Sequence, residues 1–228
     1  MRSVETTIHG MSVMRYELCL PDDFEEERAS SEPFFVPDKT QFTTPEAITK
    51  NLQIIRAAQK ANDQIEYGLV RVKSEGKTFI LAKELTPLKG TSNGFCYDVY
   101  PKQRYDNYVF SGQVVPIEIM DFIHSHTLNT NYDPAISNLF SPSDIKEMGG
   151  KYGQRYWVIG PDGSAICLIN ENPQVFGDEF LTPANKYQKI FDVAGLTYPE
   201  ALRAFEECIH NCQLRPYYSQ DLRIFHQR

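Results

Sequence analysis

Residues 123–145 read IHSHTLNTNYDPAISNLFSPSDI, and this stretch decides how the chain is interpreted. His124 and His126 close an apolar run that is typical of a buried strand. Alternate residues of a strand point to the same face, so the two imidazoles can converge on one ion. Ser141 and Asp144 form a Ser-x-x-Asp pattern, which predicts a helix start. Asp144 can therefore supply a third ligand and leave a fourth position for water, as in catalytic zinc sites.

The composition is that of a globular domain. The 228 residues are 41% apolar and 23% charged, which is enough to bury a core. The net charge of -7, with no block of Lys or Arg, disfavours a nucleic-acid partner, and no run of about 18 apolar residues predicts a membrane span. Five cysteines without a Cys-x-x-Cys pair, and no signal-peptide pattern, favour a cytoplasmic protein or one delivered into a target cell without a classical signal.

Periodicity predicts a mixed α/β fold with a single central, mostly antiparallel sheet flanked by helices. Thr44 and Pro45 are the predicted N-cap and first residue of an amphipathic helix. The predicted elements are a helix at 45–62, a hairpin at 65–73 and 78–84, a strand at 114–126, a helix from 141 to 149, a hairpin at 155–160 and 164–169, and helices at 182–193 and 198–212.

These elements suggest three parts of the chain. Residues 20–44 are rich in acidic residues, Ser and Pro, and residues 1–44 are expected to form a poorly ordered N-terminal lead-in. Residues 45–175 contain the histidine pair and are expected to form the catalytic domain. Residues 176–228 are expected to form a C-terminal helical extension packed on the core.

A hydrolytic metal centre also needs a base and a group that stabilises the oxyanion. Glu66 is the candidate base, because it lies in the apolar strand IEYGLV, where a charge is costly without a partner or a role. Ser141, one helical turn before Asp144, is the candidate oxyanion donor. Glu118 and Asp121, on the histidine strand, are the alternative bases.

The order Glu66, His124-x-His126, Ser141-x-x-Asp144 resembles the signature of the JAB/MPN domain, the JAMM zinc metallopeptidases. The words EYG, HSH and FSPSDI are most similar to the bacterial branch associated with Rhs and polymorphic toxin proteins. The resemblance covers roughly residues 45–170 and implies a cytidine-deaminase-like core.

The resemblance also implies an activity. Zn²⁺ would be bound by His124, His126 and Asp144, with Glu66 as general base and Ser141 as stabiliser of the tetrahedral intermediate. The expected function is a zinc-dependent peptidase or isopeptidase that hydrolyses an amide bond with a Glu-activated zinc-bound water. Its expected partner is a protein or peptide substrate, including conjugates of ubiquitin-like modifiers, and it would act as a toxin or effector protease.

The chain departs from the family pattern at two places. Thr127 follows the second histidine where typical members have Pro, and residues 127–140 are a longer connection than usual. We expect this connection to form a wall or lid of the active site. Its substrate-recognising residues would be Asn129, Asn131, Tyr132 and Asp133. The alternative is a solvated insertion with no role.

Several plainer interpretations stay open. The His-x-His pair is incidental in many strands, and Ser141–Asp144 is explained as a helix cap without any metal. Glu66 would then pair with an arginine or cap a turn. A catalytically silent JAB/MPN-like interaction module and a metal-dependent hydrolase of another bond are the alternative functions. The motifs of zinc deaminases and zincins are absent.

Overall fold

The computed structural model describes residues 2–8, 11–17, 24–26, 36, 39–74, 77–81, 88–89, 107–110, 113–116, 118–128, 133–149, 153–171 and 177–227. Within these ranges, ten strands form one mixed sheet in the order β3-β6-β5-β10-β11-β12-β13-β14-β4, with β7 paired to β5 beside β6. The strands are β3 (Phe24–Glu26), β4 (Gln41–Thr43), β5 (Tyr67–Ser74), β6 (Lys77–Leu81), β7 (Leu88–Lys89), β10 (Glu118–Ser125), β11 (Gly153–Ile159), β12 (Ala165–Asn170), β13 (Leu214–Ser219) and β14 (Ile224–His226).

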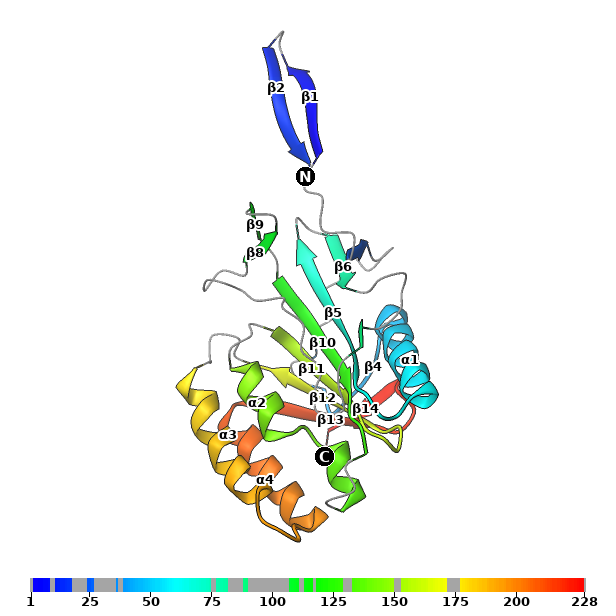
Figure 1. Cartoon of the computed structure of the whole chain (residues 1–228), viewed down its shortest axis with the longest axis vertical. Coiled ribbons are helices and arrows are strands. Elements are labelled where there is room, and N and C mark those ends of the chain that lie inside the picture. The colour runs from blue at the N-terminus through cyan, green and yellow to red at the C-terminus, as the bar shows by residue number, and fades with distance from the viewer. Residues whose placement is uncertain are drawn as a thin grey trace.

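The sheet is antiparallel except at its centre. β10 pairs with β5 in the antiparallel sense and with β11 in the parallel sense. All other neighbouring strands of this sheet are antiparallel. Two further ribbons, β1 (Arg2–Ile8) with β2 (Met11–Glu17) and β8 (Asn107–Phe110) with β9 (Gln113–Pro116), pair outside it (Figure 1). The predicted mixed α/β class with a mostly antiparallel sheet is confirmed.

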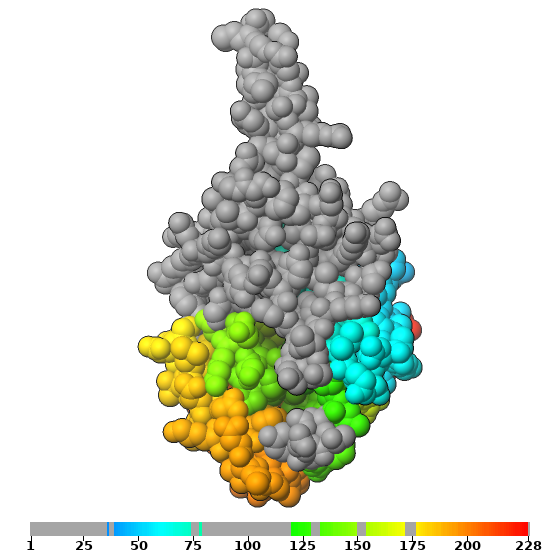
Figure 2. Space-filling view, in the orientation of Figure 1, coloured from blue at the N-terminus to red at the C-terminus, as the bar shows by residue number. Residues whose placement is uncertain are grey.

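Helices cover both faces of the sheet. The helix α1 (Glu46–Ala61) contacts β5, β10 and β11 on one face. The helices α2 (Pro142–Met148), α3 (Asp178–Phe191) and α4 (Tyr198–Asn211) pack on one another and cover the other face (Figure 1). Figure 2 shows the surface of α1 in cyan on one side and that of α3 and α4 in yellow to orange on the other, with the green β10–α2 region between them.

Each face of the sheet has its own apolar core. Trp157 and Leu52 are fully buried in the core beneath α1. Phe140 and Phe205 are fully buried in the core beneath α2, α3 and α4. The alternation along β10 sends Ile123 into the first core, whereas its neighbour Phe122 packs on the second.

Most predicted elements are present with shifts of a few residues. α1, the hairpins β5–β6 and β11–β12, and α2, α3 and α4 all match their predicted positions. Thr44 was expected to cap α1, but the N-cap is Pro45, which makes no side-chain capping bond. The hydroxyl of Thr44 contacts that of Thr49 instead, at 2.5 Å. The predicted strand at 114–126 is two strands, β9 and β10, which belong to different sheets.

The two ends of the chain contribute more strand than predicted. The C-terminal extension is not only helical, because β13 and β14 follow α4 and continue the sheet from β12. Pro216 argues against a strand when the sequence is read alone. β14, however, pairs with β13 only at Tyr218, so Pro216 has no partner on that side within the described ladder. Inside the expected lead-in, β4 pairs with β14 and Val36 is buried. The division into three domains stays a prediction.

Candidate metal centre

The histidine pair lies where β10 leaves the sheet. β10 ends at Ser125, whose hydroxyl oxygen accepts the N–H of Tyr67, at 3.0 Å. Because side chains alternate along a strand, His124 and His126 share a face with Phe122, and this face is covered by α2, α3 and α4. Both imidazoles are nearly buried, with side-chain exposures of 6% and 10%.

The third candidate ligand, Asp144, is oriented by the start of α2. Ser141 is the N-cap, and its hydroxyl oxygen accepts the backbone N–H of Asp144 at 3.2 Å. The Ser141 N–H in turn donates to Oδ2 of Asp144 at 2.7 Å. These two bonds form a reciprocal capping box. The plain interpretation of this segment as a cap is thus correct, and the cap also fixes the Asp144 carboxylate so that it faces the histidines.

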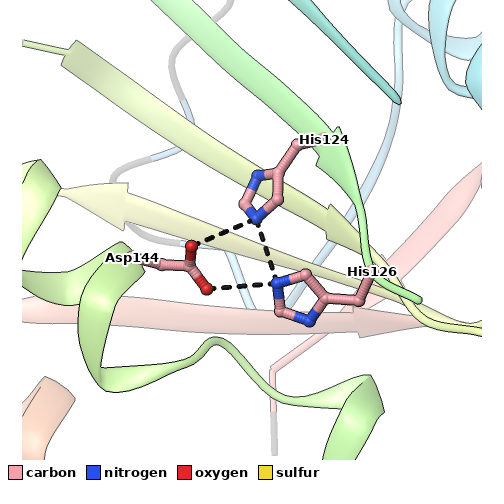
Figure 3. A group of neighbouring side chains, drawn as sticks. All are labelled: His124, His126 and Asp144. Atoms are coloured by element: carbon pink, nitrogen blue, oxygen red, sulfur yellow. Dashed lines mark hydrogen bonds and ion pairs between the residues drawn. The ribbon is translucent and has the colours of Figure 1, made fainter. Parts of the chain in front are cut away.

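The three side chains converge on one point (Figure 3). Nε2 of His124 and Nε2 of His126 are 3.1 Å apart. Asp144 Oδ2 is 3.1 Å from His126 Nε2, and Asp144 Oδ1 is 3.4 Å from His124 Nε2. Ligand atoms about 2.0–2.1 Å from a tetrahedral zinc ion lie about 3.3–3.4 Å from one another. The separation of the two Nε2 atoms is close to this value, and Asp144 offers one oxygen to each imidazole, so a movement of its carboxylate would complete three ligands for a small tetrahedral cation.

The environment of the two imidazoles differs. Nδ1 of His126 lies 3.1 Å from the carbonyl oxygen of Ser137, which fixes Nδ1 as the protonated nitrogen and leaves Nε2 as a ligand. Nδ1 of His124 is buried and has no hydrogen-bond partner among the described residues. Asp144 has 22% of its side chain exposed, more than either histidine. Solvent or a ligand can therefore reach the group from the Asp144 side.

Charge in the group is strongly coupled. Burial acts to raise the pKa of Asp144, but the two histidines outweigh it and hold that pKa well below its usual range. Burial acts to lower the pKa of His126, whereas Asp144, and to a smaller extent Glu66 and the Ser137 carbonyl, raise it to about 9. A divalent cation at this point would replace the proton that otherwise pairs with the carboxylate.

Glu66 lies beside this group. In the β5–β10 ladder His124 is opposite Gly68. Continued by two residues, this register sets Glu66 opposite His126, so both side chains belong to the same face. Glu66 is 8% exposed, and its charge is among the causes of the raised pKa of His126.

Of the two alternative bases on β10, the structure describes the side chain of Asp121. Asp121 lies on the opposite face from His124, because its side chain is bound by Arg71, Arg155 and the indole N–H of Trp157, which belongs to the core beneath α1. It therefore has no access to the histidine group. The side chain of Glu118 lies outside the described residues.

The connection between the histidines and α2 is only partly described. Asn129, Asn131 and Tyr132 lie outside the described residues, so their expected role in substrate recognition stays a prediction. Asp133 is exposed and caps the short 3-10 helix η1 (Pro134–Asn138), where it accepts the N–H of Ala135.

The part of the connection after Asp133 is anchored to the domain. Asp133 also accepts the N–H of Tyr198 at the start of α4, at 3.3 Å. The Asn138 amide donates to Asp162 at 3.0 Å, and Ile136 is buried. Because the Ser137 carbonyl contacts His126, this anchored part lies beside the group of His124, His126 and Asp144 rather than away from it.

Sequence reasoning missed three groups that hold the site in place. One is the backbone carbonyl of Ser137, which has no sequence signal. Another is Tyr187 of α3, whose buried hydroxyl donates to the carbonyl of Phe140, one residue before the N-cap of α2, at 3.0 Å. The third is Gln59, a polar residue on the apolar face of α1, and that position was a usable signal.

In the part of the chain that the structure describes, His124, His126 and Asp144 form the group of His, Cys, Asp or Glu side chains close enough to hold a metal ion. None of the helices within the same ranges has the length and apolar character needed to cross a bilayer. Comparison of the chain with family models, curated proteins and solved structures gave no match.

Proposed function

We propose that the chain is a zinc-dependent hydrolase of peptide or isopeptide bonds, with a site of the JAB/MPN type. The observation that supports this proposal is the convergence of His124, His126 and Asp144, at separations that suit a tetrahedral cation. A carboxylate and two imidazoles are ligands that zinc accepts, and three protein ligands leave one position open, as in catalytic sites. Bound zinc would supply Lewis-acid chemistry by polarising a carbonyl and making water more acidic.

Glu66 is the proposed proton acceptor. It is a buried carboxylate on the face of the sheet that carries both histidines, and it does not belong to the group of three that would hold the metal. A general base needs this kind of position, near the ligands but not bound to the ion. Its proton-bound form would then return the proton to the leaving amine.

Ser141 is the proposed oxyanion donor. Its hydroxyl oxygen accepts the Asp144 N–H, so the hydroxyl proton is available to a substrate oxygen. The same residue orients Asp144 through its backbone N–H. Ser141 would thus have two roles. It orients the ligand Asp144, and it would donate to the reacting carbonyl of the substrate.

The test compares wild type with Glu66→Gln. The substitution keeps the shape of the side chain and removes its proton-accepting role, so zinc should stay at about one ion per chain while activity is lost. Zinc is measured by elemental analysis, and activity by a mass-spectrometric inventory of new peptide ends in treated lysate. His126→Ala is the metal-free control.

The possible outcomes separate the candidate functions. New peptide ends that wild type produces and Glu66→Gln does not would support the proposal. New ends produced equally by both proteins would remove Glu66 as the base. Zinc in wild type without new ends would favour the catalytically silent module, and absence of zinc from wild type would refute the metal site.

A further inference from the structure

Gln59 is a buried polar residue in the last turns of α1. It belongs to the inward face of the helix, together with the apolar residues Ile48, Leu52 and Ile55, and it is only 2% exposed. A buried carboxamide must find hydrogen-bond partners, because burial without them is costly. The partners of Gln59 lie at the ends of the two central strands.

The contacts of Gln59 fix the orientation of its amide. Nε2 lies 2.8 Å from the carbonyl oxygen of His126, 3.3 Å from that of Ile159 and 3.4 Å from that of Gly160. Carbonyl oxygens only accept hydrogen bonds, so the amide nitrogen must be the atom that faces them. Oε1 points the other way and accepts from Nη1 of Arg56, one turn earlier on the same helix.

His126 needs such a partner because it lies beyond the end of β10. The backbone N–H of His126 still donates to the carbonyl of Ile159, at 3.0 Å, which extends the parallel pairing by one residue. Its carbonyl accepts from Gln59. The backbone of the second histidine is therefore held on both sides, and its ring direction follows from that backbone.

The same helix also holds the neighbouring turn. Nη1 of Arg56 donates to the carbonyl of Pro161 at 3.1 Å. On the other side of this turn, Asn138 of η1 is so close to Gly160 that a Cβ there would lie 2.1 Å from its Oδ1. The turn after β11 is thus packed between α1 and the segment that supplies the Ser137 carbonyl to His126.

We propose that Gln59 is a positioning residue of the metal centre, which acts through the backbone of His126. This inference rests on the proposed function, because it concerns the same three ligands. Gln59 hydrogen-bonds backbone carbonyls and Arg56 rather than the ligand atoms of the three side chains. It sets where the second imidazole stands relative to His124 and Asp144, and so it sets metal affinity and coordination geometry.

The test uses Gln59→Met, which has similar size and lacks the donor. We expect its dissociation constant for Zn²⁺, measured by chelator competition, to rise about 10- to 100-fold, as for other residues that orient metal ligands. The visible absorption of the Co²⁺ form should change as well. In the metal-free protein, the ¹³C resonance of the His126 carbonyl should shift. Gln53→Met, at an exposed position of the same helix, is the matched control and should change none of these.

Each outcome decides the proposal. If wild type binds zinc and Gln59→Met binds it equally tightly with an unchanged Co²⁺ spectrum, Gln59 has no positioning role. If wild type binds no zinc, the proposed function fails, and the positioning of a metal centre by Gln59 is overturned with it, whereas equal zinc binding by the two proteins overturns the positioning role alone. If Gln59→Met does not fold, Gln59→Glu is measured instead, since it keeps the acceptor for Arg56 and loses the donor.

Discussion

Asp121 offers the sharpest test of how the sheet beneath the site is held together. Its carboxylate is fully buried and accepts from Nε of Arg155 at 2.6 Å, from Nη2 of Arg155 at 3.1 Å and from the indole N–H of Trp157 at 2.9 Å. Arg71 forms a further ion pair with it. The side chains of the two arginines are only 5% and 3% exposed. Asp121→Ala would therefore leave two guanidinium groups buried without their carboxylate.

The expected cost is large. Removal of one partner from a buried ion pair destabilises a protein by about 3–5 kcal/mol. For a chain of this size, about 1 kcal/mol changes Tm by about 2–4 °C, so Asp121→Ala should lower Tm by about 6–20 °C. Calorimetry and guanidinium unfolding measure this effect. Asp63→Ala, at an exposed position, is the control and should change Tm little.

The pH dependence of the stability lost in Asp121→Ala follows from the pKa of the Asp121 carboxyl. Burial acts to raise the pKa of Asp121, but Arg155 and Arg71 outweigh it and lower the pKa below its usual value. A carboxyl group with a depressed folded-state pKa contributes stability above its unfolded pKa, and that contribution disappears as pH falls through the folded value. The gap between wild type and Asp121→Ala should thus be full at neutral pH and shrink below about pH 3.9. A loss below about 1 kcal/mol at pH 7 would refute the reasoning.

Four further predictions concern the site. Free Zn²⁺ at about 100 times its dissociation constant should stabilise wild type by about 2.7 kcal/mol, or about 5–11 °C in Tm, and His126→Ala should abolish this shift in a calorimetric scan. Because the pKa of His126 is raised to about 9 and zinc binds neutral imidazole, zinc affinity should increase from about pH 6.5 to pH 9; a flat profile in chelator competition would contradict this. In the metal-free protein, folding stability should change with pH in the opposite direction to zinc affinity. The raised folded-state pKa of His126 gives stability that is present below about pH 6.5 and lost toward pH 9, and urea unfolding midpoints measure this change. Tyr187→Phe leaves the buried carbonyl of Phe140 without its donor and should cost about 1–3 kcal/mol in urea unfolding, whereas an unchanged midpoint would show that this bond is dispensable.

The local elements around the site could be read from the sequence because their causes are local. The capping box of Ser141 and Asp144 needs only four consecutive residues, and both of its predicted bonds are present. The same-face arrangement of His124 and His126 follows from the two-residue period of a strand. These two local facts give the three candidate ligands, and the structure places them together.

Other features could not be read because they depend on which strands become neighbours. Asp121 was an alternative base, and only the pairing of β10 with β5 and β11 shows that its carboxylate is bound by Arg71 and Arg155 instead. The strand β13 was not predicted, and it joins the sheet by pairing with β12, which lies far from it in the sequence.

The sequence by itself determined the α/β class, the helices and hairpins, and the identity of the candidate ligands. Periodicity and capping depend only on residues a few positions apart in the chain. The tertiary structure alone decided that β10 lies between antiparallel β5 and parallel β11, which sets Glu66 near His126. It also decided that the Ser137 carbonyl orients the imidazole and that Gln59 holds the backbone of the same histidine. These contacts join groups that are distant in the chain or use backbone atoms that every residue has. The type of residue at a position therefore does not predict them. Only the packing of α1 and η1 around the ends of the two central strands brings them into hydrogen-bonding distance.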